Sequence, residues 1–135
     1  MKQPNNIIGP VKCTEDSFYR SWMEFLAPFH KLTARERDVA ARIIAQYFKL
    51  SERITDPAVM KEVLWSQTSR KDMRESLKMS QAHFQMVLAK LREAGIIVNG
   101  DLNRRYLPHK TEGNRFVLAV VFDWSSPEHP ANVSQ

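Results

Sequence analysis

Four polar side chains follow Ser80 at spacings that place them on the outer side of a short helix: Gln81, His83, Gln85 and Lys90. Each is a hydrogen-bonding or cationic side chain of the right length to reach a base edge or a phosphate in a major groove. We expect Gln81 and Gln85 to contact base edges. His83 and Lys90 are expected to read bases or to brace phosphates. These residue types at this spacing predict a surface that contacts nucleic acid.

The elements that must present these side chains are two short helices joined by a tight turn, within residues 69–97. Ser69, followed three residues later by Asp72, predicts the start of the first helix, because the hydroxyl can accept from a free backbone amide and the carboxylate lies at the positive end of the dipole. Ser80 predicts the N-cap of the second helix, and Gly95 predicts its end. The inner side of that helix carries apolar residues at helical spacing: Phe84, Val87, Leu88 and Leu91.

This stretch resembles the winged helix-turn-helix superfamily of DNA-binding domains, and the resemblance covers roughly residues 32–122. In that family a Leu-x-x-Ser turn precedes the recognition helix, and residues 77–80 match it. The helix ends there in a Lys/Arg-Leu-x-x-x-Gly-Ile/Leu-Ile pattern, and residues 90–97 match that. The resemblance implies a mainly α fold with a small β-hairpin or sheet, in which an additional N-terminal helix precedes the helix-turn-helix and a β wing follows it.

Extended segments are expected after the second helix. Asn99-Gly100 is a turn dipeptide, and Arg104–Leu107 and Phe116–Phe122 are β candidates. The polar stretch His109–Asn114 between them looks like the wing, which in this superfamily reaches an adjacent groove or the sugar-phosphate backbone. Further DNA contacts are therefore expected in the wing and at the start of the turn region: Arg104, Arg105, Lys110 and Arg115, with Ser69, Arg70, Lys71 and Ser80.

Basic residues gather in the same part of the chain. Residues 66–115 contain ten Lys and Arg against five Asp and Glu, an excess that equals the net charge of +5 of the whole chain. A basic excess centred on a helix-turn-helix is the electrostatic pattern of a phosphate-binding face. A solvated surface rich in lysine and arginine is the alternative interpretation. Four basic residues further upstream are expected to be solvated, with some of them near phosphate: Arg35, Arg37, Arg42 and Lys49.

Three further helices are expected before the turn region. The first, over Asp16–Leu26, begins an aromatic stripe that either packs on the chain's own core or forms a homodimer interface through Phe18, Trp22 and Phe25. The full stripe is Phe18, Trp22, Phe25, Leu26 and Phe29. Thr33 and Glu36 predict a capping box for a helix that runs to about Leu50, and Asp56-Pro57 begins a short helix through Trp65.

Length and composition limit the other possibilities. At 135 residues the chain suits one domain, which we place at 15–124 between an arm at 1–14 and a tail at 125–135. No apolar run approaches the roughly 20 residues of a membrane span, and no signal core is visible. The single Cys13 excludes an internal disulfide and a thiolate metal cluster. We therefore expect a cytoplasmic protein associated with the nucleoid, or one in the host cytoplasm or the virion if the chain is viral.

Catalytic patterns are absent from the sequence. There is no glycine-rich phosphate loop, no HExxH and no nucleophile elbow. The histidines are too far apart to form a local ligand pair: His30, His83, His109 and His129. An enzyme, a metal and a cofactor are therefore not expected. The methionines of the central part are expected to fill the core or the turn: Met60, Met73, Met79 and Met86.

Two functions from different classes remain open. The first is sequence-specific binding of double-stranded DNA by a small transcriptional regulator that acts by operator occupancy. No effector pocket is visible, so control is expected from protein level, oligomerisation or a partner. The second is a winged-helix component for protein interaction or assembly, in a viral particle or a replication complex, with little or no sequence-specific DNA reading. The aromatic first helix and the run Phe116–Phe122, which is apolar on both faces, favour that alternative.

Overall fold

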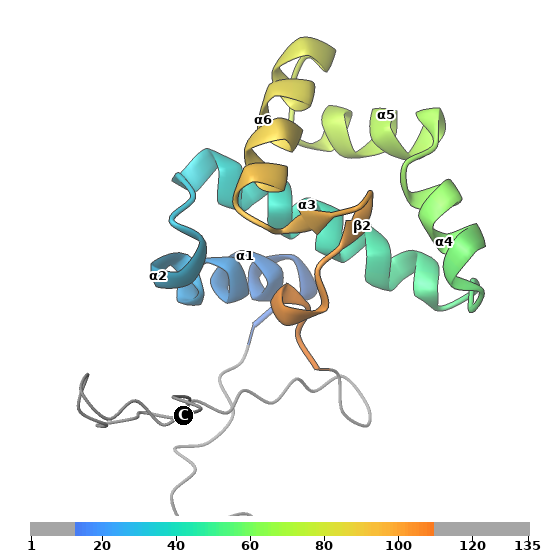
Figure 1. Ribbon diagram of the computed structural model, residues 1–135, viewed down its shortest axis with the longest axis horizontal. Coiled ribbons are helices and arrows are strands. Elements are labelled where there is room, and N and C mark those ends of the chain that lie inside the picture. Colours follow the sequence, from blue (N-terminus) through green and yellow to red (C-terminus); the bar gives the residue numbers. More distant parts are fainter. Residues whose placement is uncertain (1–12, 110–135) are drawn as a thin grey trace, which may run out of the picture.

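The computed structural model describes residues 13–109, so the predictions for Lys110, Arg115, Phe116–Phe122 and the boundary at 124 lie outside the described residues. Over this range the chain forms six α-helices, followed by a two-stranded antiparallel sheet and a 3-10 helix, η1 (Arg104–Tyr106) (Figure 1). The elements are α1 (Glu15–Phe25), α2 (Ala27–His30), α3 (Ala34–Ser51), α4 (Pro57–Leu64), α5 (Gln67–Ser76), α6 (Gln81–Glu93), β1 (Ile97–Val98) and β2 (Asp101–Leu102). The expected mainly α class with a small β-hairpin is confirmed.

Helix α3 lies at the centre of this fold. It contacts α1, α4, α5 and α6, with α1 and α2 on its lower side and α5 and α6 on its upper side in Figure 1. The expected capping box begins it. The Thr33 hydroxyl accepts from the Glu36 amide at 3.3 Å, and the Glu36 carboxylate accepts from the Thr33 amide at 2.9 Å. Val39, Ile43 and Ile44 are fully buried, so α3 provides the apolar surface on which the other helices pack.

Helix α1 begins at Glu15, close to the prediction, but the aromatic stripe does not form one face. Phe18 and Trp22 lie partly buried at the edge of the core, whereas Phe25 and Phe29 are 47% and 72% exposed. The stripe is therefore divided, and only its first part packs on the chain's own core.

The side of α1 that faces the core lies one residue further along the chain. Tyr19 and Met23 are buried, and the Tyr19 ring stacks on that of Phe48 at 5.8 Å. The buried His30 accepts from the Leu32 amide at Nδ1, and its Nε2 lies 2.8 Å from the Met23 carbonyl oxygen. Contacts with residues far along the chain therefore decide which side of α1 is buried.

The β1–β2 hairpin forms at the predicted turn dipeptide. Asn99 and Gly100 have φ values of +54° and +75°, as a type I′ turn requires, and the strands pair Ile97 with Leu102. The tip is tied to α4, because Lys61 Nζ donates to the Asn99 carbonyl at 2.9 Å and the Trp65 indole donates to that of Gly100 at 2.8 Å. Asp56 caps α4 and Pro57 is its first residue, as predicted.

The predicted strand over Arg104–Leu107 is wrong, since this segment contains η1. The Asn103 carboxamide accepts from the Arg105 amide at 3.1 Å and donates to the Gly95 carbonyl at 2.8 Å. These two bonds turn the chain out of the hairpin. The Trp22 indole then donates to the Tyr106 carbonyl at 2.8 Å and holds η1 beside α1.

Within residues 13–109 no helix has both the length and the apolar character needed to cross a membrane.

Gly95 ends α6, as predicted, and its backbone requirement can be tested. Its φ is +81°, its amide donates to the Arg92 carbonyl at 3.1 Å, and the Ile96 amide donates to that of Leu91 at 2.9 Å. A Cβ at this position would meet no atom within 4 Å, so a side chain costs only backbone strain. We predict that Gly95→Ala lowers the free energy of unfolding by about 1–2 kcal/mol in urea titrations. Gly95→Asn should lose less, and equal loss from both variants would contradict this account.

Candidate nucleic-acid interface

Helices α5 and α6 and the connecting residues 77–80 form the turn unit, and the backbone of its turn is fixed locally. Lys78 has a φ of +54°, its amide donates to the Glu75 carbonyl at 3.1 Å, and the Met79 amide donates to that of Arg74 at 3.0 Å. This is the arrangement that also ends α6. The predicted N-cap of α6 is confirmed, because the Ser80 hydroxyl accepts from the His83 amide at 3.1 Å.

The predicted start of α5 is wrong by three residues. Ser66 is the N-cap, and its hydroxyl accepts from the Ser69 amide at 3.2 Å. Ser69 itself is only 5% exposed, and its hydroxyl accepts from the Gln46 carboxamide at 3.0 Å. A buried glutamine needs a hydrogen-bonding partner, and Ser69 supplies it. Ser69 therefore does not belong to the candidate DNA-contacting surface.

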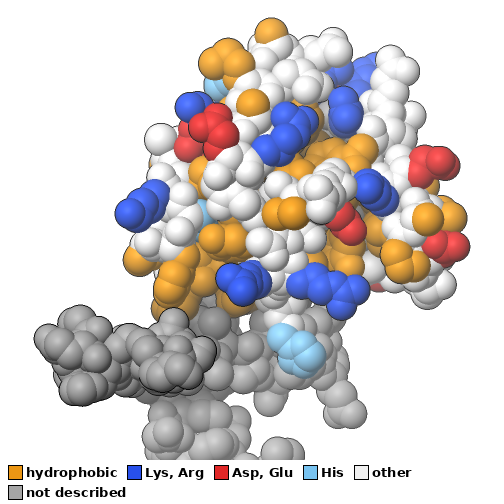
Figure 2. Space-filling view, in the orientation of Figure 1, with side chains coloured by type: hydrophobic (Ala, Val, Ile, Leu, Met, Phe, Trp, Pro, Cys, Tyr) orange, Lys and Arg blue, Asp and Glu red, His pale blue; other side chains and the backbone are white. Residues whose placement is uncertain are grey.

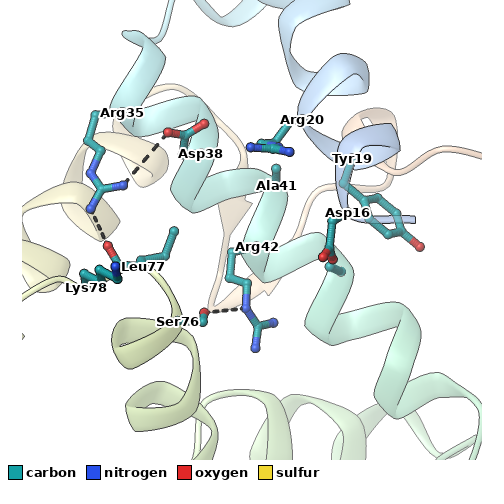
Figure 3. Close-up of a pocket in the computed structure, with 11 residues that line it drawn as sticks. Asp16, Tyr19, Arg20, Arg35, Asp38, Ala41, Arg42, Ser76, Leu77 and Lys78 are labelled. Atoms are coloured by element: carbon teal, nitrogen blue, oxygen red, sulfur yellow. Dashed lines mark hydrogen bonds and ion pairs between the residues drawn. The ribbon is translucent and has the colours of Figure 1, made fainter. Parts of the chain in front are cut away.

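Two arginines of α3 bond to the turn unit. Arg35 is exposed, as predicted, whereas Arg42 is partly buried, contrary to the prediction that it is solvated. Arg42 donates from Nε to the Ser76 hydroxyl at 2.7 Å and from Nη1 to the Gln46 carboxamide oxygen at 2.9 Å. Arg35 donates from Nη2 to the Leu77 carbonyl, as the dashed line in Figure 3 shows. These bonds attach the end of α5 and the turn to α3.

The same correction applies to one of the other two upstream cations. Arg37 donates from Nη1 to the Leu32 carbonyl at 2.9 Å, so its guanidinium braces the start of α3. Lys49 is exposed, as expected for a solvated side chain.

A cavity of about 380 Å³ lies between α1, α3 and the end of α5 (Figure 3). Four cations and two carboxylates line the cavity: Arg20, Arg35, Arg42, Lys78, Asp16 and Asp38. The Tyr19 hydroxyl adds no charge at neutral pH, and burial and, to a lesser extent, Glu15 and Glu52 raise its pKa to about 12. The cavity therefore places an excess of positive charge behind the turn.

The outer side of α6 carries the polar residues that the sequence placed there. Gln81, His83 and Lys90 are exposed, and Gln85 is partly exposed. The inner side is buried as predicted, through Phe84, Val87, Leu88 and Leu91.

The methionine prediction holds for three residues and fails for one. Met60, Met73 and Met79 are buried, whereas Met86 is 67% exposed on the outer side of α6. A helical wheel of α6 would have predicted that Met86 is exposed, because position 86 lies away from the side that carries Phe84, Leu88 and Leu91.

The predicted phosphate contacts fall into two groups. Arg70 and Lys71 lie on α5. Arg70 Nε is buried and has no hydrogen-bond partner among residues 13–109, and the exposed Lys71 ammonium lies 4.0 Å from a Glu75 carboxylate oxygen. Arg104 and Arg105 are exposed on η1.

Arg104 and Arg105 lie near the C-terminal end of α6. The Asn103–Gly95 hydrogen bond places η1 at the C-terminal end of α6, and a helix of 13 residues is about 20 Å long. Gln81, at the other end, is therefore distant from the η1 arginines. On the face shown in Figure 2, Lys and Arg side chains are spread out, with apolar and uncharged surface between them.

The corrected role of Ser69 can be tested against its neighbour. We predict that Ser69→Ala lowers the free energy of unfolding by about 1–3 kcal/mol in urea titrations, because it leaves the NH2 group of the buried Gln46 without its acceptor. Thr68→Ala is the matched control, since Thr68 is exposed and should change little. Equal stability of the two variants would show that the Gln46–Ser69 bond contributes nothing.

Among residues 13–109 no three His, Cys, Asp or Glu side chains are arranged to hold a metal ion. Comparison of the chain with protein-family models, curated proteins and solved structures finds no match.

Proposed function

We propose that this chain binds double-stranded DNA in a sequence-specific manner, as a small transcriptional regulator that acts by occupying its operator. In this proposal the fold is a winged helix-turn-helix, and α6 enters the major groove. A single structural observation supports this proposal. Helix α6 is held to the core along one side by apolar side chains, while its other side presents long polar side chains to solvent.

Four polar side chains of α6 have a role in this proposal. Gln81 and Gln85 contact base edges, and His83 and Lys90 contact bases or phosphates. Ser80 contributes indirectly, because its hydroxyl is engaged by the His83 amide and fixes the first turn of α6.

The basic residues outside α6 position the duplex and carry no sequence information. Arg70 and Lys71 meet the backbone near the start of the turn unit, and Arg104 and Arg105 meet it near the end of α6. Lys110 and Arg115, beyond the described residues, would extend this contact. The proposal requires no catalytic group and no cofactor, and it places the protein where DNA is present, in the cytoplasm or nucleoid.

Salt dependence tests this proposal before any target sequence is known. Because several cations should displace counterions from phosphates, the slope of log affinity against log salt should be at least about 3 in magnitude in gel shifts on unrelated duplexes. Arg105→Ala should reduce the slope by about 1. Lys49→Ala removes the same charge from an exposed site on α3 and should leave the slope unchanged. No shift at roughly 50 mM salt and micromolar protein would defeat the proposal.

Protein assembly is a second candidate function, favoured by a specific observation. Phe25 and Phe29 are 47% and 72% exposed and lie within 11 residues of Phe18 and Trp22 on α1 and α2. Large exposed aromatic side chains close together indicate an interaction surface. A homodimer through this surface would be compatible with DNA binding, since α6 lies on the opposite side of α3 in Figure 1.

Light scattering on Phe25→Asp tests the homodimer. If the surface is the interface, the wild-type chain is a dimer and the variant is a folded monomer. Phe25 is preferable to Trp22, because the Trp22 indole donates to the Tyr106 carbonyl at 2.8 Å and its loss would disturb η1. Val59→Asp, at a position on α4 that is 44% exposed, is the control and should remain dimeric. A symmetric dimer would require an inverted-repeat site with half-sites about 34 Å apart, whereas a wild-type monomer would exclude this interface.

A further inference from the structure

Met86 is the only large apolar side chain of the turn unit that is strongly exposed, with 67% of its surface free at the middle of α6. Ala82 lies four residues before it and Ala89 three residues after it, and both are exposed. Residues at these spacings share one side of a helix. We call these three residues the α6 ridge. It lies opposite the buried Phe84 and Leu91, so it is the part of α6 that projects furthest from the core.

Polar side chains flank the α6 ridge on both sides. At 3.6 residues per turn, Gln81 and Gln85 lie along one flank, and His83 and Lys90 lie along the other. The ridge is thus a narrow apolar line between two rows of hydrogen-bonding groups. A helix that docked into a groove on a protein would present large apolar anchors at such positions. Two of the three ridge residues are alanines, which are too small to be such anchors. The ridge therefore suits a groove that is narrower and more polar than a helix-binding groove on a protein.

The major groove of DNA offers such a target. Thymine is distinguished there by its C5-methyl group, which apolar side chains contact, and adenine presents an acceptor and a donor that a glutamine carboxamide matches. Ala82 and Ala89 allow the axis of α6 to approach the groove floor, and Met86 is long and flexible enough to reach a methyl group. Gln85 is the neighbour of Met86 in the chain, so one turn of α6 carries groups suited to both bases of an A·T pair.

We propose that the α6 ridge reads thymine methyl groups, with Met86 as the principal contact and Gln85 on adenine, so that the preferred site has A·T pairs opposite the middle of α6. This inference rests on the proposed DNA binding and adds the identity of the bases that α6 selects. Met86 is a specificity-determining residue in this account, and the phosphate contacts do not depend on it.

The test begins with selection of duplexes by the full chain from a randomised pool at fixed salt. Each selected duplex is then compared with one in which dU replaces dT at one position. Deoxyuridine keeps the pairing and the groove acceptors and lacks only the methyl group. The wild-type chain should bind the dU duplex about fourfold more weakly for each methyl group that Met86 contacts.

The variants assign this effect to the α6 ridge. Met86→Ala should bind the dT duplex about as weakly as the wild type binds the dU duplex, with a dT to dU affinity ratio near one. Val59→Ala is the control, because it removes an apolar side chain of 44% exposure from α4 and should keep the fourfold ratio. Met86 is exposed, so its replacement should leave the melting temperature nearly unchanged, which circular dichroism checks.

Three results would overturn the inference and leave DNA binding intact. The first is equal affinity of the wild-type chain for dT and dU duplexes. The second is a selected site without A·T pairs, and the third is a Met86→Ala variant that weakens all duplexes equally. Failure to bind any duplex at roughly 50 mM salt is a separate outcome, since it defeats the proposed function itself and the inference with it.

Discussion

The firm attachment of the inner side of α6 is the constraint on which the candidate surface depends. Phe84, Leu88 and Leu91 are between 0% and 1% exposed, and burying side chains of this size contributes about 1.5–3 kcal/mol each. Ser80 and Gly95 fix the two ends of the same helix. The outer side chains are therefore placed by apolar contacts and backbone bonds that would themselves touch no DNA. A surface that reads bases needs such rigidity, because a loosely held helix would lose the register of its contacts.

Hydrogen bonds from α3 then set how α5 and the turn are oriented. Arg42 bridges Gln46 and Ser76, Gln46 bonds to the buried Ser69, and Arg35 bonds to the Leu77 carbonyl. Apolar packing alone tolerates sliding, whereas a buried amide that loses its partner costs about 1–3 kcal/mol. This network consequently favours one orientation of the turn unit on α3. Glutamine also has two uses here, because Gln46 is buried and bonds to Ser69, whereas Gln81 is exposed on α6.

Several local hydrogen-bonding patterns could be predicted from the sequence, the cap of α5 excepted, whereas the choice between neighbouring faces of a helix could not. The caps at Ser80 and Gly95 and the Asn99-Gly100 turn involve residues only a few positions apart, so the sequence contains all that is needed. In α1 two sets have the same spacing and differ by one residue: Phe18, Trp22, Phe25 and Phe29, and Tyr19, Met23, Leu26 and His30. The second set is the more buried because of Phe48 and Tyr106, which lie far along the chain. Similarly, the buried Ser69 bonds to a glutamine that lies 23 residues away in the chain. The Asn103–Gly95 bond turns the chain into η1, so the alternating strand pattern could not predict where Arg104 and Arg105 lie.

The most direct measurement of the central claim is an NMR titration of the full chain with a duplex of random sequence, followed by backbone amide shifts. The account predicts that the changes concentrate in residues 80–90 of α6 and its cap and in residues 67–71 of α5, with smaller changes around η1. The amides of α4 and of the exposed aromatic part of α1 and α2 should stay in place. Changes confined to α1 and α2, or no changes at millimolar duplex, would contradict the assignment of the turn unit as the nucleic-acid interface.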